Sequence, residues 1–330
     1  MDKKFATASI TCLLLLASCG CGDLASEYIA KPVQSKAITP FSETESNDLI
    51  LSCDDLSNEW SSTASNSVIS PLSFISASLL KSGTSESLDE FKSLAEKTNV
   101  ETEKFSISSL GSIASTDAIE ESVVQDYNDH LASVFVGELD ELENSLNKFY
   151  DDDVALDNNG TYYFNSLSVE DMFYIPIEDI TDLPFNKQGK FDYTINAYQG
   201  KFLEGDNYYL IEIPIYESSL RLLISKEGVD LSSVDSSIIF QSPENEGRIK
   251  ATIPEFSVED HYYKSFGERY LAQDSKFGFS RYGIEGSSFT ANGPTATSPD
   301  FDFDIIFDRP FYFASIYEEI PLFLGTVQSL

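Results

Sequence analysis

Histidine, a common general base and metal ligand, occurs only twice in this sequence, as His130 and His261. Neither histidine belongs to an H-E-x-x-H or comparable ligand spacing, so zinc hydrolysis has no support. The sequence also contains no G-x-S-x-G, G-x-G-x-x-G or G-x-x-x-x-G-K motif. We therefore expect a protein that is not an enzyme and that uses no metal and no cofactor.

Two acidic runs, at residues 151–153 and 157–160, invite comparison with calcium sites. A twelve-residue calcium loop places an oxygen ligand at its first position. Ala155 would occupy that position here, and its side chain has no oxygen. A solvated turn is the better interpretation of these runs.

The charge of the chain excludes several classes of partner. The 330 residues carry 55 acidic and 21 basic side chains, a formal net charge of −34. Such a protein repels the phosphates of nucleic acid and the anionic surface of a membrane. Because 42% of the residues are hydrophobic and 13% are aromatic, the chain can still bury a substantial core, and intrinsic disorder is excluded.

The N-terminus has the pattern of an export signal. Residues 1–18 contain Lys3 and Lys4, followed by an apolar run that is too short to cross about 30 Å of hydrocarbon. The run ends in Leu16-Ala17-Ser18-Cys19, which resembles the lipobox of bacterial lipoproteins. The resemblance implies that residues 1–18 are a signal peptide and that Cys19 becomes the lipid-modified N-terminus of an exported, envelope-anchored protein. The alternative is an ordinary secretory signal, cut nearby, in which Cys19 is incidental.

Two thiols would remain after such processing, Cys21 and Cys53, and the sequence leaves open whether they pair. Apart from the signal, no apolar run reaches the length of a transmembrane helix, so the lipid would be the only membrane attachment. Residues 19–43 are rich in Ser, Thr, Ala and Pro without a sustained period, which predicts a tether. A single domain is predicted over residues 44–330.

Helices are predicted first along this domain, and strands follow. Helical spacing of apolar residues favours helices after Ser70-Pro71 and after Thr84, and over residues 119–135 and 139–149. Short aromatic and β-branched runs predict strands over residues 162–169, 208–215, 220–224, 249–258, 301–307, 311–317 and 322–327. This order of elements is typical of an α+β fold.

Seven phrases, in order along the domain, resemble the motifs of the serpin family of protease inhibitors. They cover nearly all of residues 44–330, and no single one is specific by itself. They are Asn66-Ser67-Val68-Ile69-Ser70-Pro71-Leu72-Ser73, Leu146-Asn147-Lys148-Phe149, Asn165-Ser166-Leu167, Leu183-Pro184-Phe185, Ile213-Pro214-Ile215-Tyr216, Ile253-Pro254-Glu255-Phe256, and the C-terminal pair Phe307-Asp308-Arg309-Pro310-Phe311 and Leu322-Phe323-Leu324-Gly325-Thr326-Val327.

The resemblance implies a monomer with about three β-sheets, a surrounding set of about nine helices and an exposed reactive loop. In that family a target protease of serine or cysteine type cuts the loop, and the cut loop then inserts as a new strand into the large sheet. Glu285-Gly286-Ser287 is similar to the hinge at which the loop begins. Counting from the hinge places the reactive bond at Asp300-Phe301, and counting back from Phe307 places it at Pro299-Asp300.

The hinge departs from the pattern of inhibitory members, which keep the inserting positions small. Alternation from Ser287 predicts that Phe289 enters the buried face of the sheet, where its ring is too large. Pro294 would remove a hydrogen bond from a central strand. The leading hypothesis is thus a tethered inhibitor. Its alternatives are a non-inhibitory serpin-fold surface protein that binds a protein, peptide or glycan, and an unrelated solute-binding lipoprotein of the envelope.

Overall fold

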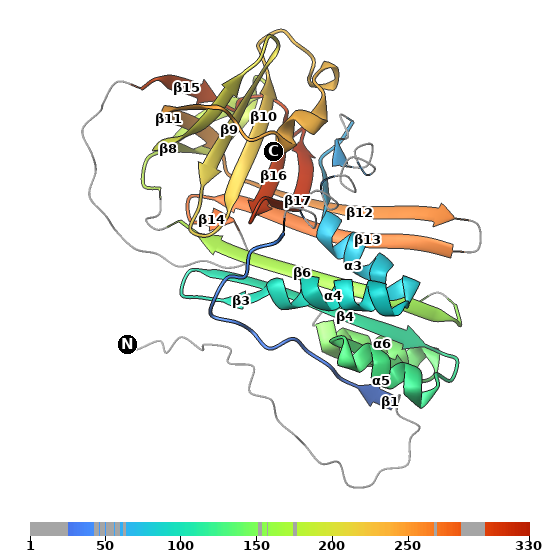
Figure 1. Cartoon of the computed structure of the whole chain (residues 1–330). Coiled ribbons are helices and arrows are strands. Elements are labelled where there is room, and N and C mark those ends of the chain that lie inside the picture. Colours follow the sequence, from blue (N-terminus) through green and yellow to red (C-terminus); the bar gives the residue numbers. More distant parts are fainter. Residues whose placement is uncertain are drawn as a thin grey trace, which may run out of the picture.

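The computed structural model describes residues 26–42, 46, 50, 56, 60–61, 64–150, 154–156, 158–173, 177–266, 269–284 and 301–330. Two β-sheets and the helices around them make up this part of the chain (Figure 1). The α+β class predicted from the sequence is confirmed.

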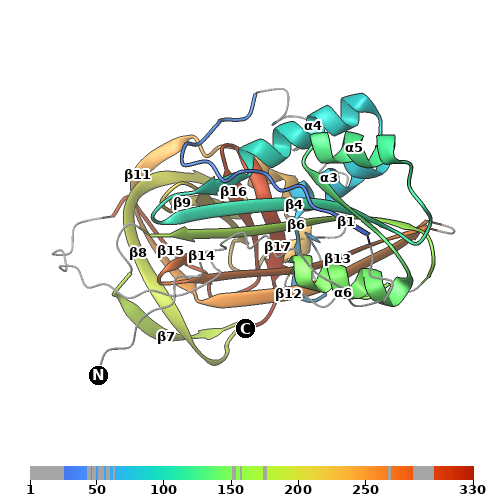
Figure 2. The same cartoon turned by 90° about the horizontal axis from the view of Figure 1, so that it is seen from below.

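The first sheet, which we call sheet A, has eight strands. Its hydrogen-bonded order is β1 (Ser26–Tyr28), β5 (Ala132–Val136), β4 (Phe105–Ser115), β6 (Thr161–Met172), β14 (Gly283–Ile284), β13 (Arg269–Ser280) and β12 (Phe256–Phe266), with β3 (Asn99–Glu101) paired beside β4. Figure 2 shows β4 and β6 running together on one side and β12 and β13 together on the other. The short β14 joins these two halves.

The second sheet, sheet B, has nine strands. Its order is β15 (Phe303–Ile306), β11 (Asn245–Pro254), β8 (Gln188–Glu204), β9 (Tyr208–Pro214), β10 (Ser219–Ser225), β16 (Phe311–Tyr317), β17 (Ile320–Val327) and β2 (Ser67–Ile69), with β7 (Ile180–Phe185) also paired to β8. The long β8 pairs with β7 and β11 and, through its last four residues, with β9. This continuity is why the described residues form two sheets where the sequence predicted about three.

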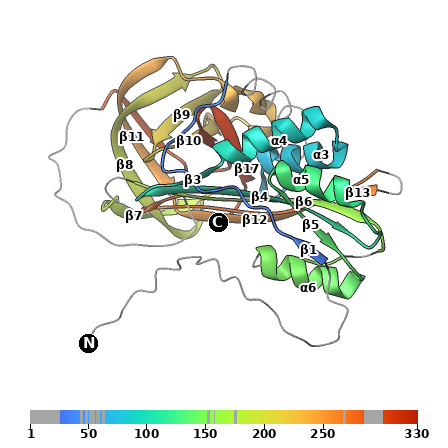
Figure 3. The ribbon, with the colours of Figure 1, turned by 60° about the horizontal axis from the view of Figure 1, so that its bottom comes forward.

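Helices cover both faces of sheet A. Among the described residues the α-helices are α3 (Pro71–Ser82), α4 (Ser85–Lys97), α5 (Glu121–Asp129) and α6 (Leu139–Tyr150). Figure 3 shows α6 on one face of the sheet and the other three on the opposite face. Ser70 caps α3 ahead of its first-turn proline, and Thr84 caps α4 through a capping box with Ser87, so both predicted helix starts are confirmed.

Two predicted elements differ from the structure. The helix predicted over residues 119–135 ends at Asp129, because Leu131 has a positive φ of 66° and the residues after it form β5. The strand predicted over residues 249–258 is two strands in different sheets, β11 and β12, which are separated at Glu255. In both cases an apolar run continues through a change of direction, which the pattern alone does not reveal.

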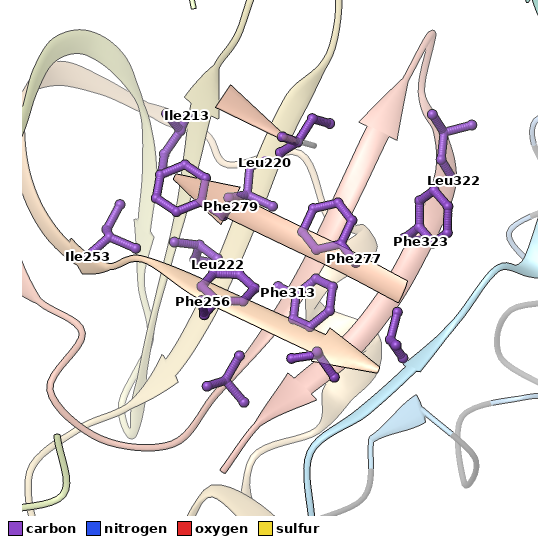
Figure 4. Packing of buried hydrophobic residues seen from close by; sticks show 14 of the residues in the cluster. Ile213, Leu220, Leu222, Ile253, Phe256, Phe277, Phe279, Phe313, Leu322 and Phe323 are labelled. Carbon is purple, nitrogen blue, oxygen red and sulfur yellow. The ribbon is translucent and has the colours of Figure 1, made fainter. Parts of the chain in front are cut away.

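The main core lies between the two sheets. Aromatic residues of sheet A face those of sheet B there, as Figure 4 shows. Phe277 of β13 stacks on Phe313 of β16, with ring centroids 4.8 Å apart, and Phe256 of β12 contacts both rings. Because burial of aromatic rings contributes strongly to stability, this layer fixes β12 and β13 against sheet B.

The N-terminal residues 26–41, which we call the strap, lie along sheet A and not away from the domain. Strand β1 pairs with β5, and Ser35 exchanges main-chain hydrogen bonds with Asn99 and Glu101 at β3. Phe41 packs against the main core. This segment was predicted as part of a tether, so the structure leaves only residues 20–25 between Cys19 and the strap.

Candidate strand-insertion site

Strand β14 occupies a position between two longer strands of sheet A. After β13 the chain turns at Arg281 and Tyr282 and runs back as β14. Its two residues pair with Phe279 and Ser280 on one side and with Asp171 and Met172 of β6 on the other, antiparallel in both cases. The tight turn and the double pairing mean that β14 is the beginning of a strand in the middle of the sheet.

Gly283 makes this close approach feasible. Its φ of 135° lies in a region that favours glycine. A methyl group at this position would overlap the main-chain carbonyl oxygen of Asp171. Any larger residue would therefore force β14 away from β6.

The place that β14 begins to fill continues along both neighbouring strands, and we call it the insertion position. β6 has twelve residues, and β14 pairs with only the last two. Over residues 161–170, the partner of β6 among the described residues is β4. β13 likewise pairs with β12 along its length and with β14 only at its end.

The first turn of α3 connects the two strands that flank the insertion position. The main-chain N–H of Ser70 donates to the side-chain oxygen of Gln273 on β13, and the Gln273 amide donates to the Ser70 carbonyl, both at 2.9 Å. The Ser73 hydroxyl donates to the carbonyl of Asn165 on β6, at 2.8 Å. The start of α3 is therefore hydrogen-bonded to both strands that flank the insertion position, β13 and β6.

Asn165 lies near the centre of β6, and only the nitrogen of its side-chain amide has a hydrogen-bond partner among the described residues. Its Nδ2 donates to the Ser109 hydroxyl at 3.0 Å. Its Oδ1 is buried and has no hydrogen-bond partner within the described part of the chain. A buried acceptor without a donor costs about 1–3 kcal/mol, so the site can gain free energy from a donor placed beside Asn165.

Asp171 is a buried ionisable residue directly opposite Ile284 at the start of the insertion position. It is 0% exposed, and its carboxylate accepts hydrogen bonds from the main-chain N–H groups of Tyr216, Glu217 and Ser218 and from the Ser218 hydroxyl. Burial raises the pKa of Asp171 to about 6, although these hydrogen bonds oppose the shift.

Most residues predicted to act in the reactive loop fall outside the described residues. These are the hinge residues Glu285, Gly286, Ser287 and Phe289, and Pro299 and Asp300 at the predicted bond. Phe301 is described and lies partly buried just before β15. Cys19, Cys21, Cys53 and residues 1–18 also fall outside.

Asp171, Gly283 and Gln273 were not predicted from the sequence. Gly283 had one usable signal, its position just ahead of the predicted hinge. Asp171 and Gln273 had none, because a single carboxylate near the end of a strand or a single amide within one is ordinary on an exposed surface. No group of His, Cys, Asp and Glu suited to a metal ion occurs among the described residues. Within the same ranges, the helices are all too short or too polar to span a membrane.

Comparison with known proteins identifies the fold. No protein-family model matches the sequence, and no curated protein matches it either. Among solved structures, the native-state crystal structure of tengpin, a thermophilic serpin, matches with a TM-score of 0.71 at 16% identity, over 93% of this chain and 100% of that one. Serpin48 of the insect Tenebrio molitor matches with a TM-score of 0.67 at 17% identity, over 88% and 100% of the two chains.

A third match is a complex of thyroxine-binding globulin with thyroxine, with a TM-score of 0.61 at 14% identity, over 85% of this chain and 96% of that one. The chain therefore has the serpin fold, as the sequence motifs predicted. In the sequence, β14 immediately precedes Glu285, the first residue of the predicted hinge.

Proposed function

We propose that this protein is a serpin-like inhibitor of endopeptidases of serine or cysteine type. Its loop after Ile284 would be cut by the target protease and would then insert into sheet A. The observation that carries the proposal is β14, which already occupies the first two residues of the insertion position in antiparallel register with both neighbours. Residues added there would form main-chain hydrogen bonds alternately to β6 and to β13.

The register of β14 predicts where each following residue would lie. Ile284 is opposite Asp171 of β6 and Phe279 of β13. Continued without a bulge, this register sets Thr290 opposite Asn165 and Gln273. It sets Pro294 opposite Thr161 and Arg269, the first residues of β6 and β13. Pro294 would therefore lie at the end of the insertion position on both sides, where a missing N–H costs less than in the middle of a strand.

The same register assigns the faces of the inserted strand. Ile284 is buried in the main core, so alternation places Gly286, Ser288, Thr290 and Asn292 on the core face. The Thr290 hydroxyl would be available to the unpaired oxygen of Asn165. Phe289 would lie opposite the exposed Ser166 on the face that carries α6. In this register the core positions are small and polar, and Phe289, expected from the sequence to obstruct the core, would point away from it.

The proposal is tested by incubating the protein with a panel of proteases, followed by denaturing electrophoresis. The panel includes proteases that cut after acidic residues, which would recognise Asp300-Phe301. We expect an adduct that survives denaturation and a cleaved form that melts at a higher temperature than the intact protein. Cleavage that produces no adduct and no gain in melting temperature contradicts inhibition.

The second candidate is a non-inhibitory surface protein that uses the serpin fold to bind a ligand. The similarity to thyroxine-binding globulin favours it, since that neighbour is described in complex with a small molecule. For this candidate the loop would be cut as an ordinary substrate. The same protease panel separates the two, because only the inhibitor yields both the adduct and the stabilised cleaved form.

We further propose that Cys19 is lipid-modified and anchors the protein at the bacterial envelope. The strap supports a close attachment. Seven peptide units separate Cys19 from Ser26, and at about 3.5 Å each they reach roughly 25 Å. Cys19→Ala should release the protein from the membrane fraction or leave its precursor uncut, and unchanged attachment would contradict the anchor. In either case the test does not depend on inhibition.

A further inference from the structure

Asp171 joins three parts of the molecule at the place where β14 lies. Its main chain pairs with Phe105 of β4 and with Ile284 of β14. Its side chain reaches the turn between β9 and β10 in sheet B, where the Ser218 hydroxyl and N–H donate at 2.6 and 2.7 Å and the Glu217 N–H donates at 3.1 Å. Figure 1 shows this end of the β9–β10 hairpin beside β14.

The carboxylate is held by donors that carry no charge. Its hydrogen bonds come from the main chain and from one serine, and among the described residues no Lys or Arg forms an ion pair with it. The turn itself, residues 215–218, contains two ionisable side chains, Tyr216 and Glu217, and neither is basic. Tyr317 of β16 has a pKa raised by burial and by Glu318 and Glu217. On the β4 side, Lys104 contributes its main-chain carbonyl to Met172.

We propose that Asp171 is a positioning residue for loop insertion, whose ionised carboxylate fixes the β9–β10 turn against the end of β6 and so keeps the start of the insertion position in register. This role rests on the function proposed above. Gly283 is its counterpart in β14, because only glycine fits against the Asp171 carbonyl. Asp171 thereby links the β9–β10 turn of sheet B, through its side chain, to the strand proposed to insert into sheet A, through its main chain.

Protonation of Asp171 would weaken this arrangement. A carboxylic acid has a proton of its own to donate, and among the described partners of Asp171 the three main-chain N–H groups cannot accept it, which leaves the Ser218 hydroxyl. Burial raises the pKa of Asp171 to about 6, whereas the hydrogen bonds from the turn lower it. If the turn alone separates while Asp171 stays buried at the end of β6, these hydrogen bonds are lost and the pKa rises further, so proton uptake favours the separated turn. We therefore expect insertion to become slower as the pH falls from 7.5 to 5.

The first measurement is hydrogen exchange at the amides of Tyr216, Glu217 and Ser218 in the intact full chain. After correction for intrinsic rates, wild-type exchange should accelerate by roughly tenfold between pH 7.5 and pH 5, which is the loss of about one charged hydrogen bond. In Asp171→Asn, exchange should be fast at both values. Ser218→Ala keeps the carboxylate and removes one donor, so it should show a smaller loss and retain the pH dependence. Asp182→Asn, at an exposed position on β7, is the matched control and should behave as wild type.

The second measurement is the rate at which the loop-cleaved protein gains thermal stability, at the same two pH values. We expect the wild-type rate to fall by roughly tenfold at pH 5, and the Asp171→Asn rate to be low and independent of pH. Equal pH profiles for wild type and Asp171→Asn would overturn the role of Asp171 while leaving inhibition intact. A wild-type protein that gains no stability on cleavage at either pH would overturn the proposed function itself, and the positioning role with it.

Discussion

Sheets A and B differ in how completely their centres are filled. Every residue of β16 and β17 in sheet B is buried. In β6, at the centre of sheet A, only Val169 and Asp171 are fully buried, and serines alternate with apolar residues. The buried charges differ as well. Arg221 of sheet B pairs with Glu212 at 2.6 Å and Glu319 at 3.2 Å, whereas the donors to Asp171 of sheet A within the described part of the chain are all uncharged.

This difference indicates which sheet can change. The central strands of sheet B are fully buried, and their aromatic residues pack directly against those of sheet A. Along β6 and β13, hydrogen-bonding capacity is left for a further strand among the described residues, and an unpaired amide oxygen lies at its centre. We therefore expect substitutions in sheet B to change the stability of the intact protein, and substitutions at the insertion position to change mainly what happens after cleavage.

The largest effect is expected in the aromatic layer. Phe313→Ala removes a fully buried ring that stacks on Phe277 and contacts Phe256, and it should lower the free energy of unfolding by about 3–5 kcal/mol. Urea unfolding of the intact protein measures this loss. The control is Ile306→Ala, on the exposed side of β15. Substitutions at the surface usually change stability by no more than about 0.5 kcal/mol, so this variant should lose far less. Similar losses for the two variants would contradict the assignment of sheet B as the rigid unit.

The next effect tests the register of the inserted strand. If Thr290 takes a core position, Thr290→Phe should overpack it by about 1–3 kcal/mol and slow insertion by tenfold or more. Phe289→Gln should leave insertion nearly unchanged, because residue 289 would lie on the face that carries α6, away from the main core. The readouts are the adduct fraction and the gain in melting temperature on cleavage, with Thr290→Ala as the size control. The reverse result, in which Phe289→Gln blocks insertion and Thr290→Phe is tolerated, would show that the alternation starts one residue later.

The sequence predicted much of the frame that surrounds the site. Ser70-Pro71 and Thr84 set two helix starts, because capping depends on residues within one turn of each other. Strand β16 was predicted with its observed ends, since its aromatic run is bounded by Pro310 and by a turn at Glu318. These features are local, so a single sequence is sufficient to reveal them.

The candidate site itself could not be predicted in this way, because it depends on contacts between distant segments. Gln273 and Ser70 are 203 positions apart, and Asp171 and Ser218 are 47 apart. β4 was missed because its polar positions are serines and Gly111 interrupts its pattern, although the strand is central to sheet A. The phase of the inserting strand also depends on a distant contact, the pairing of Ile284 with Asp171, which counting from Gly286 does not supply.

A smaller effect is expected at the turn that begins β14. Gly283→Ala adds a methyl group that would overlap the Asp171 carbonyl oxygen, and the φ of 135° alone costs a non-glycine residue about 1–3 kcal/mol, so β14 cannot stay in place. We expect β14 to separate from β6 instead, so the intact protein keeps most of its stability while insertion after cleavage slows. Gly228→Ala is the control, because Gly228 also has a positive φ but no atoms lie within 4 Å of an added methyl group. If both variants insert equally well, close approach at Gly283 is not what positions the strand.

The smallest effect is expected at the strap, whose strand β1 forms the edge of sheet A beside β5. The Lys31 ammonium lies 4.7 Å from the centre of the Phe149 ring of α6, and an exposed pair of this kind contributes about 0.5–1 kcal/mol. Lys31→Ala should therefore lower overall stability by no more than about 1 kcal/mol. Hydrogen exchange should increase locally, in β1 and in the amide of Ala30, which donates to Ser133. Lys36→Ala removes the same charge from an exposed position of the strap and controls for electrostatics in this acidic protein. If Lys31→Ala instead accelerates exchange throughout β4 and β6, the strap stabilises the centre of sheet A as well as its edge. The strand β6 beside the insertion position would then depend on the strap for its stability.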